Sequence, residues 1–251
     1  MPVLAIERLS KNFGGVRAVH HVDLRVEPQE IVGLIGPNGS GKSTIVNLVT
    51  GVFAPNEGRI RLRDQDIAGW APHRVLAAGI ARTFQNIRLF GNLTVWQNLW
   101  VAQNARSQQA EGALSRWLAV GRSRMTQIES TLDFCRLGDK RDELARNLAF
   151  GEQRRLELAR ALAAEPDLLL LDEPAAGMNA AEIDDLRERI LGLRRRGKTV
   201  VLIEHHMELV MAVADRVAVL NFGEKIAEGN PAAVQDDGRV REAYLGTARR
   251  G

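Results

Sequence analysis

Four short runs of apolar residues recur along the chain, each bounded by glycines or by a helical pattern. Such a run has no polar face, which is typical of a parallel strand buried on both sides. Strands of this kind alternate with helices in α/β proteins. We therefore predict an α/β fold whose core strands are residues 31–35, 168–171, 199–203 and 217–220.

Three other segments alternate apolar and polar residues, as half-buried strands do. They are residues 3–9, 19–26 and 58–63. Because they surround the first glycine-rich segment of the chain, we expect them to form an antiparallel β lobe near its start.

Between about residues 94 and 138 the pattern becomes helical. Thr94 is followed three residues later by Gln97, a capping-box spacing in which the glutamine reaches back to the cap. We predict a helical lobe over about residues 94–162, within a single domain that covers residues 1–251. The chain shows no internal repeat or sustained heptad, which excludes solenoids and long coiled coils.

The composition supports a globular protein, because 45% of the residues are hydrophobic and 26% are charged. No apolar run approaches the roughly 20 residues that a membrane-spanning helix needs. The first residues, Met1 to Arg8, lack the basic and apolar regions of a secretory signal. We therefore expect a cytoplasmic protein without a membrane-spanning segment.

Charge and cysteine content narrow the function classes further. The chain has 34 lysines and arginines against 31 acidic residues, mostly interspersed, which argues against a nucleic-acid partner. The basic cluster at residues 194–198 suits a helix C-terminus better than a binding patch. Cys135 is the single cysteine, so an intramolecular disulfide is excluded. Its helical, apolar surroundings favour a buried small side chain over a functional thiol.

A phosphate-loop pattern follows the first apolar run directly and precedes a helical pattern. Its small residues let backbone N–H groups surround the β- and γ-phosphates, and the next helix points its positive end at them. Lys42 adds a cation, and Ser43 can coordinate Mg²⁺. The predicted ligands are ATP and Mg²⁺, and the predicted binding residues are Gly36, Pro37, Asn38, Gly39, Ser40, Gly41, Lys42, Ser43 and Thr44.

Two carboxylates, Asp172 and Glu173, end the apolar run at residues 168–171. Taken alone, acids at a strand end are more often solvated or cap a helix. Ligands of α/β proteins bind at the carboxyl ends of strands, however, and the phosphate loop favours the catalytic interpretation. We predict that Asp172 holds Mg²⁺ and that Glu173 is the general base for the water that attacks the γ-phosphate.

Residues 148–153, Leu-Ala-Phe-Gly-Glu-Gln, precede a helical pattern and stand shortly before these acids. With the phosphate loop, this segment resembles the signature of ABC ATPases. The resemblance implies a P-loop NTPase core with an antiparallel β lobe and a helical lobe, in which two subunits clamp ATP. It also implies that Ala149, Phe150, Gly151 and Glu152 bind ATP held by the partner subunit, through helix N-terminal amides.

The same resemblance implies roles for three more residues: Gln85 binds Mg²⁺ and senses the transporter, Asn179 crosses the dimer interface, and His205 contacts the γ-phosphate. Phe13 resembles the aromatic residue that stacks on adenine, although a buried strand-end phenylalanine would give the same pattern. The expected catalytic residues are Lys42, Gln85, Glu173 and His205.

The signature departs from the common pattern, because Ala149 replaces a serine and Phe150 replaces a glycine. The serine hydroxyl would donate a charge-assisted hydrogen bond to the γ-phosphate, worth about 1.5–3 kcal/mol. Without this hydroxyl, we expect the backbone amides near Gly151 and the helix dipole to provide a larger share of the γ-phosphate binding.

Residues 147–151, 172–179 and 203–207 resemble more closely the ATPases of branched-chain amino-acid importers, and residues 240–246 suggest the larger, LivG-like one of the two in such importers. His206 differs from the pattern of these ATPases, in which an acidic residue is expected at this position. The resemblance implies a peripheral protein at the cytoplasmic face of a membrane. Its implied partners are a second ABC ATPase, permease subunits and, indirectly, a periplasmic or extracellular solute-binding protein. The resemblance favours a different chain as the second ATPase, and the sequence leaves a pair of identical chains open.

Several alternatives are weaker or stay open. An importer of short amides, urea or another small solute would fit the same ATPase, because the solute contacts other subunits. ABC ATPases that act on DNA usually carry a coiled coil between their two halves, and those that act on ribosomes carry a second ATPase cassette; the chain shows neither feature. A non-hydrolysing regulatory protein is disfavoured because it would not need the predicted catalytic residues, all of which are present. Adjacent His205 and His206 should diverge, which argues against a metal site.

Residues 104–124 carry several arginines among apolar residues and could contact lipid or a partner. A partly solvated helix explains the same pattern, and we favour it. By resemblance, Arg88, Leu89 and Phe90, just after Gln85, are better candidates for the surface that faces the transporter.

Overall fold

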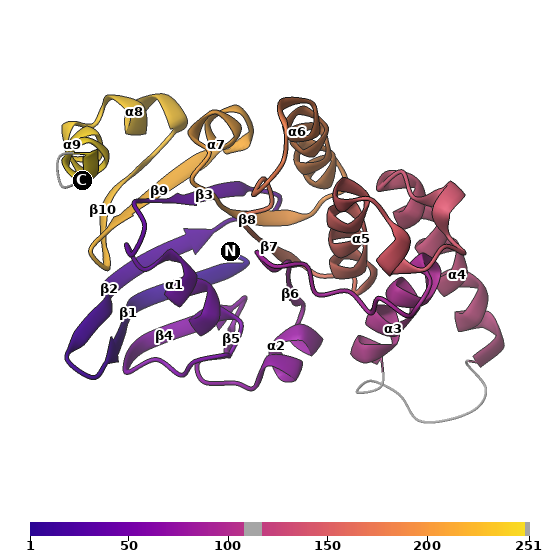
Figure 1. Ribbon diagram of the computed structural model, residues 1–251. Coiled ribbons are helices and arrows are strands. Elements are labelled where there is room, and N and C mark those ends of the chain that lie inside the picture. Colours follow the sequence, from indigo (N-terminus) through magenta and orange to yellow (C-terminus); the bar gives the residue numbers. More distant parts are fainter. Residues whose placement is uncertain (108–116, 249–251) are drawn as a thin grey trace.

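Two β-sheets form the centre of the structure, a computed structural model that describes residues 1–107 and 117–248 (Figure 1). In this part of the chain the larger sheet has six strands in the order β10-β9-β3-β8-β7-β6. The smaller sheet has four strands in the order β2-β1-β4-β5. The larger sheet consists of β3 (Ile31–Ile35), β6 (Ile80–Arg82), β7 (Leu168–Asp172), β8 (Thr199–Ile203), β9 (Arg216–Asn221) and β10 (Glu224–Gly229).

The four apolar runs of the sequence are β3, β7, β8 and β9, and they pair in parallel. Alternate residues enter opposite cores: Val32 and Leu34 pack on the side of the smaller sheet, while Ile31 and Ile35 pack against the helices of the other side. Both faces are therefore buried, which explains why these runs lack polar residues. The predicted α/β core is confirmed. The sequence did not predict β6, which is too short to show a period, or the largely polar β10.

The smaller sheet is antiparallel, as predicted, and consists of β1 (Leu4–Phe13), β2 (Val16–Val26), β4 (Glu57–Leu62) and β5 (Gln65–Asp66). The strands β1 and β2 extend further toward their connecting turn than the alternating segments 3–9 and 19–26 predict. Register shifts between Ile6 and Asn12 break the alternation, so the pattern ends before the strand does.

Helices complete two further layers (Figure 1). The apolar residues of α1 (Lys42–Val49) belong to the core between the sheets, to which α2 (Pro72–Ala78) also contributes. The opposite face of the larger sheet is covered by α5 (Phe150–Ala163), α6 (Ala180–Arg195) and α7 (Met207–Val213). The chain then continues through α8 (Pro231–Asp236) and α9 (Gly238–Ala248).

The predicted helical region contains α3 (Val95–Ser107) and α4 (Trp117–Phe134), which pack with α5 at one end of the molecule (Figure 1). Short 3₁₀ helices at Gly138–Lys140 and Ala145–Asn147 lead into α5. The capping box is confirmed, because Thr94 N donates to Gln97 Oε1 at 2.9 Å and Gln97 N donates to Thr94 Oγ1 at 3.2 Å. Within the described helices, none is both long and apolar enough to cross a bilayer.

Cys135 is fully buried, and burial raises the pKa of its thiol to about 12. The interpretation as a small core side chain is confirmed. The question of whether residues 104–124 contact lipid or pack as a solvated helix lies outside the described residues, because it depends on residues 108–116 and on side chains near them.

Candidate functional site

The turn from β3 into α1 follows a path that only glycine permits at two positions. Gly36 and Gly41 have φ values of 150° and 104°. A Cβ at Gly36 would lie 2.2 Å from the carbonyl oxygen of Leu220, and one at Gly41 would lie 2.6 Å from that of Ala18. The loop is thus held closely between β9 and β2, with α1 directly behind it.

Lys42, the first residue of α1, is 5% exposed and lies across this loop. Its Nζ donates to the carbonyl oxygens of Gly36 at 2.7 Å and Pro37 at 3.0 Å. Burial lowers the pKa of Lys42, while Glu173 and Asp172 oppose this shift. A buried ammonium whose nearest partners are neutral carbonyls suits an anion that enters the loop.

Asp172 ends β7, which lies between β8 and β6 in the larger sheet. The Asp172 side chain is buried, and its Oδ2 accepts a 2.6 Å hydrogen bond from Nη2 of Arg82. Its backbone N donates to Thr83 Oγ1 at 3.3 Å. The carboxylate is therefore fixed by the neighbouring strand β6 and the residue after it.

Glu173 follows in a left-handed backbone conformation, with φ 48°. Its N donates to the carbonyl oxygen of Ile203 at 2.8 Å, which holds the turn against β8. A non-glycine residue in this region costs about 1–3 kcal/mol. The backbone turn aims the carboxylate at residues of two other segments.

Those residues are Gln85 and His205. Gln85 Nε2 donates to Glu173 Oε2 at 2.7 Å, and His205 Nδ1 lies 4.0 Å from the same oxygen. Glu173 also acts electrostatically on Lys42. The structure thus brings together three predicted residues that lie far apart in the sequence, next to the phosphate loop.

Sequence reasoning missed Glu204, a fully buried carboxylate between two parts of this site. Its Oε1 accepts from Ala175 N at 2.7 Å, and its Oε2 accepts from the backbone N of His205 at 3.1 Å and of His206 at 3.3 Å. Glu204 therefore joins the turn after Glu173 to the turn that carries His205. An acid directly after an apolar run was the available signal, since Glu204 follows residues 200–203 as Asp172 follows residues 168–171.

No group of three or more His, Cys, Asp and Glu side chains is placed to hold a metal ion in the described part of the chain. A different set of oxygen donors suits Mg²⁺ once a nucleotide is present: the exposed Ser43 hydroxyl, the Asp172 carboxylate and the Gln85 amide are the hard ligands that this ion prefers.

Phe13 lies at the end of β1 and is 42% exposed, so the alternative of a buried strand-end phenylalanine is wrong. Phe53 contacts its ring edge-on, with centroids 5.2 Å apart, and Lys11 Nζ lies 5.3 Å from its centroid. The ring remains partly available to a ligand.

The segment 148–153 opens α5, with Ala149 at the N-cap. Glu152 Oε2 accepts from Ala149 N at 3.0 Å, but alanine has no oxygen to accept in return, so only half of a capping box forms. Asn179 caps α6 fully: its Oδ1 accepts from Glu182 N at 3.1 Å, and Glu182 Oε2 accepts from Asn179 N at 2.9 Å.

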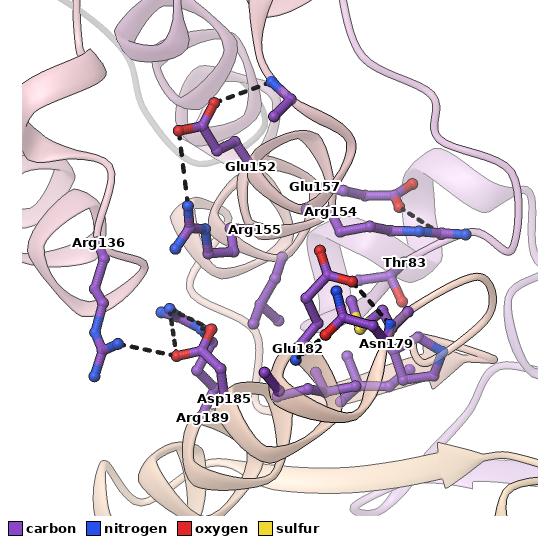
Figure 2. Close-up of a pocket in the computed structure, with 18 residues that line it drawn as sticks. Thr83, Arg136, Glu152, Arg154, Arg155, Glu157, Asn179, Glu182, Asp185 and Arg189 are labelled. Carbon is purple, nitrogen blue, oxygen red and sulfur yellow. Dashed lines mark hydrogen bonds and ion pairs between the residues drawn. The ribbon is translucent and has the colours of Figure 1, made fainter.

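These two helix N-termini open into one pocket of about 490 Å³. Figure 2 shows Glu152, Asn179 and the ion pair of Asp185 and Arg189 among the residues that line it. Ala149 and Gly151 also line it. The structure therefore gathers Ala149, Gly151, Glu152 and Asn179 on a single surface, whereas Phe150 is exposed and does not line this pocket.

A family model described as "ABC transporter" matches residues 19–176, and one described as "Branched-chain amino acid ATP-binding cassette transporter" matches residues 224–249. The chain is 43% identical to the high-affinity branched-chain amino acid transport ATP-binding protein LivG of Escherichia coli K12, over 98% of this chain and 99% of the relative. It is 42% identical to the corresponding protein BraF of Pseudomonas aeruginosa, with the same coverage.

Among solved structures, the chain is similar to the ADP conformation of MJ1267, an ATP-binding cassette of an ABC transporter. The TM-score is 0.85 at 30% identity, over 98% of this chain and 99% of that one. A nucleotide-free ATP-binding cassette from an ABC transporter matches with a TM-score of 0.84 at 31% identity, over 97% and 99% of the two chains. The predicted ABC ATPase fold is therefore confirmed, and the chain belongs to the family of ATP-binding subunits of ABC transporters, which are ATPases.

Proposed function

We propose that this subunit hydrolyses Mg-ATP together with a second ABC ATPase to drive a permease that imports branched-chain or related amino acids. The observation that carries the chemistry is the convergence of Gln85 and His205 on one oxygen of Glu173, beside the phosphate loop. The solute class rests on the relatives named for branched-chain amino acid transport and on the match at residues 224–249. The whole chain, residues 1–251, would act as one ATPase domain with a helical lobe at about 94–162.

The phosphate loop, residues 36–44, binds the phosphates in this proposal. Lys42 leaves its carbonyl partners for the β- and γ-phosphates, because an anion is a far stronger partner for a desolvated ammonium. Ser43, Gln85 and Asp172 would hold Mg²⁺, which would neutralise developing charge on the phosphates when bound. Phe13 stacks its exposed ring on adenine.

Glu173 accepts the proton of the attacking water, and His205 contacts the γ-phosphate. Glu173 is 17% exposed on its side chain, partly desolvated, and already receives the Gln85 amide, so its position is defined before substrate arrives. The N-termini of α5 and α6 face ATP on the partner subunit, through Ala149, Phe150, Gly151, Glu152 and Asn179. The pocket that all of these residues except Phe150 line supports this assignment.

Ala149→Ser is expected to raise the free energy of unfolding by about 1 kcal/mol, because the serine hydroxyl completes the capping box at the start of α5. The same hydroxyl lies where the common signature donates to the γ-phosphate, so ATP affinity of the assembled pair should rise by less than about tenfold. Denaturant unfolding and nucleotide titration check the two effects. A large loss of ATPase activity in a folded variant would contradict the proposed cross-subunit contact.

A second, apolar groove of about 390 Å³ lies between α2, α3 and α5, and we propose that it receives a permease segment. Phe84, directly before Gln85, lines it, and so does Phe90, which is 48% exposed. A partner in this groove would contact the loop that carries a catalytic residue. The proposal places the subunit on the cytoplasmic face of the membrane that holds the permease.

Phe90→Ala should weaken binding to the permease by at least about tenfold, since an aromatic anchor in a groove is typically worth about 2 kcal/mol. Affinity for the purified permease in nanodiscs provides the measurement. Met125→Ala is the matched control, because Met125 is 53% exposed on α4 and does not line the groove. Equal affinities of the two variants would remove the groove from the interface.

The solute class is tested by reconstituting the subunit with its permease, partner ATPase and solute-binding protein. Uptake of labelled leucine, isoleucine and valine is compared with that of urea and short amides. ATP-dependent uptake of the three amino acids is expected. Uptake confined to urea or amides would reassign the solute and leave the ATPase chemistry intact.

A further inference from the structure

Arg82 ends β6 and connects two parts of the nucleotide site. Its Nη2 donates to Asp172 Oδ2 at 2.6 Å, and its Nη1 donates to Asn47 Oδ1 at 2.7 Å. The Arg82 and Asp172 side chains are 12% and 6% exposed. One buried guanidinium therefore joins the strand that ends in Asp172 to α1, the helix that begins with Lys42.

The other side of the same residue faces the apolar groove. Arg82 and Phe84 both line the groove, and the guanidinium carbon of Arg82 lies 5.1 Å from the centroid of the Phe84 ring. Arg88 lies over the same ring, at 4.6 Å. Phe84 N donates to the buried Glu157 at 3.2 Å, which fixes the start of the loop that leads to Gln85.

We propose that Arg82 is a positioning residue that orients the Asp172 carboxylate for Mg²⁺ and links that orientation to the occupancy of the groove. The inference rests on the proposed function, which takes Asp172 as a Mg²⁺ ligand and the groove as the permease site. Residues behind a metal ligand commonly set its orientation and the affinity for the metal. Arg82 holds Oδ2 through a planar fork whose second arm is anchored on Asn47, so the carboxylate cannot rotate freely.

A purely stabilising role explains these contacts less well. Taking both charges of an ion pair out of water is costly, and a well-packed apolar pair often stabilises a fold equally. The ion pair of Arg82 and Asp172 lies between the phosphate loop and the groove, and Asp172 acts electrostatically on Lys42. This location favours a role in positioning the Asp172 carboxylate over a role in stability alone.

The test uses the full chain with a non-hydrolysable ATP analogue and Mn²⁺ as a spectroscopic probe for the metal. Electron paramagnetic resonance gives the dissociation constant of Mn²⁺ from the protein–nucleotide complex. Arg82→Lys keeps the charge but cannot bridge both acceptors, and it should weaken Mn²⁺ binding by about tenfold. Asn47→Ala, which frees one arm of the fork, should weaken it severalfold. Affinity for the analogue in EDTA should change by less than about threefold, because Lys42 and the loop are untouched.

Arg160→Lys is the matched control, since Arg160 lines the same groove and bonds to the carbonyl of Arg88 instead of Asp172. Asp172→Asn distinguishes the assignment of Asp172 as a metal ligand from the assignment of Arg82 as its positioning residue. If Asp172→Asn binds Mn²⁺ like the wild type, the assignment of Asp172 as a ligand is wrong. If Asp172→Asn loses the metal while folded Arg82→Lys and Asn47→Ala keep it, only the role of Arg82 is overturned.

The link to the groove is measured by repeating the Mn²⁺ titration with the permease bound. Assembly should change the Mn²⁺ dissociation constant of the wild type severalfold and leave that of Arg82→Lys unchanged. An unchanged constant in the wild type, or an equal change in Arg82→Lys, would show that Arg82 does not carry this link.

Discussion

ATP hydrolysis by the assembled transporter is expected to fall by at least about 100-fold when Lys42 is replaced by alanine, a loss typical of removing one preorganised donor to a transition-state oxyanion. Lys42 is the cation that lies across the phosphate loop, with its ammonium 2.7 Å from the carbonyl oxygen of Gly36. Lys42 is buried, so its charge acts on the phosphates with less screening than a charge in bulk water would. Steady-state phosphate release measures the effect.

The fold of Lys42→Ala should survive, because the three contacts of the ammonium lie within its own loop and its burial carries a desolvation cost. Lys198→Ala is a matched control: its Nζ donates to the carbonyl oxygen of Pro166 at 3.1 Å, far along the chain from the phosphate loop. That variant should keep wild-type turnover. If Lys42→Ala hydrolysed ATP within a few-fold of wild type, the assignment of the phosphate loop would be wrong.

The parallel strands and the glycine-containing turn after β3 could be predicted because each has a local cause. A strand buried on both faces is apolar along most of its length, as β7 is before Asp172 and β8 is after Thr199. The turn after β3 needs glycine at Gly36 and Gly41 because other backbone segments pass within 2.2 and 2.6 Å of where a Cβ would stand. Constraints of this kind are visible in a single segment of sequence.

Contacts between distant segments could not be predicted from local patterns. In the sequence, Arg82 looks like a surface residue, because the strand that it ends is too short to show a period. In the structure, its Nη2 donates to Asp172 and its Nη1 donates to Asn47 on α1. In the sequence, Glu204 cannot be told from other acidic residues, whereas in the structure its carboxylate accepts hydrogen bonds from three backbone N–H groups of two turns. Such partners depend on the order of strands in the sheet, which places β6, β7 and β8 side by side.

Family resemblance supplied what local patterns could not, and the structure adds geometry to it. Gln85, Glu173 and His205 were connected in the sequence only by the resemblance, whereas the structure gathers them around one oxygen. The strained φ of 48° at Glu173 had no signal in the sequence, because glutamate seldom adopts it.

Glu173→Gln is expected to keep ATP bound and to slow γ-phosphate release by about 100-fold or more, within the range typical of proton-transfer catalysis. Glutamine keeps the size of the side chain and an oxygen that accepts the 2.7 Å bond from Gln85. It cannot take a proton from water. Lys42, Ser43 and Asp172 are unchanged, so binding and chemistry should separate.

The variant should accumulate the closed pair, because the amides at the start of α5 stay engaged with uncleaved ATP on the other subunit. If the two ATPases differ, only one of the two sites is blocked, so nucleotide occlusion and single-turnover release are measured together on the assembled transporter. Glu208→Gln is the control, since Glu208 is an exposed acid in the first turn of α7. Wild-type release from the site of this subunit would exclude Glu173 as the base, while loss of ATP binding would make it a structural ligand, because a general base contributes to chemistry and not to nucleotide affinity.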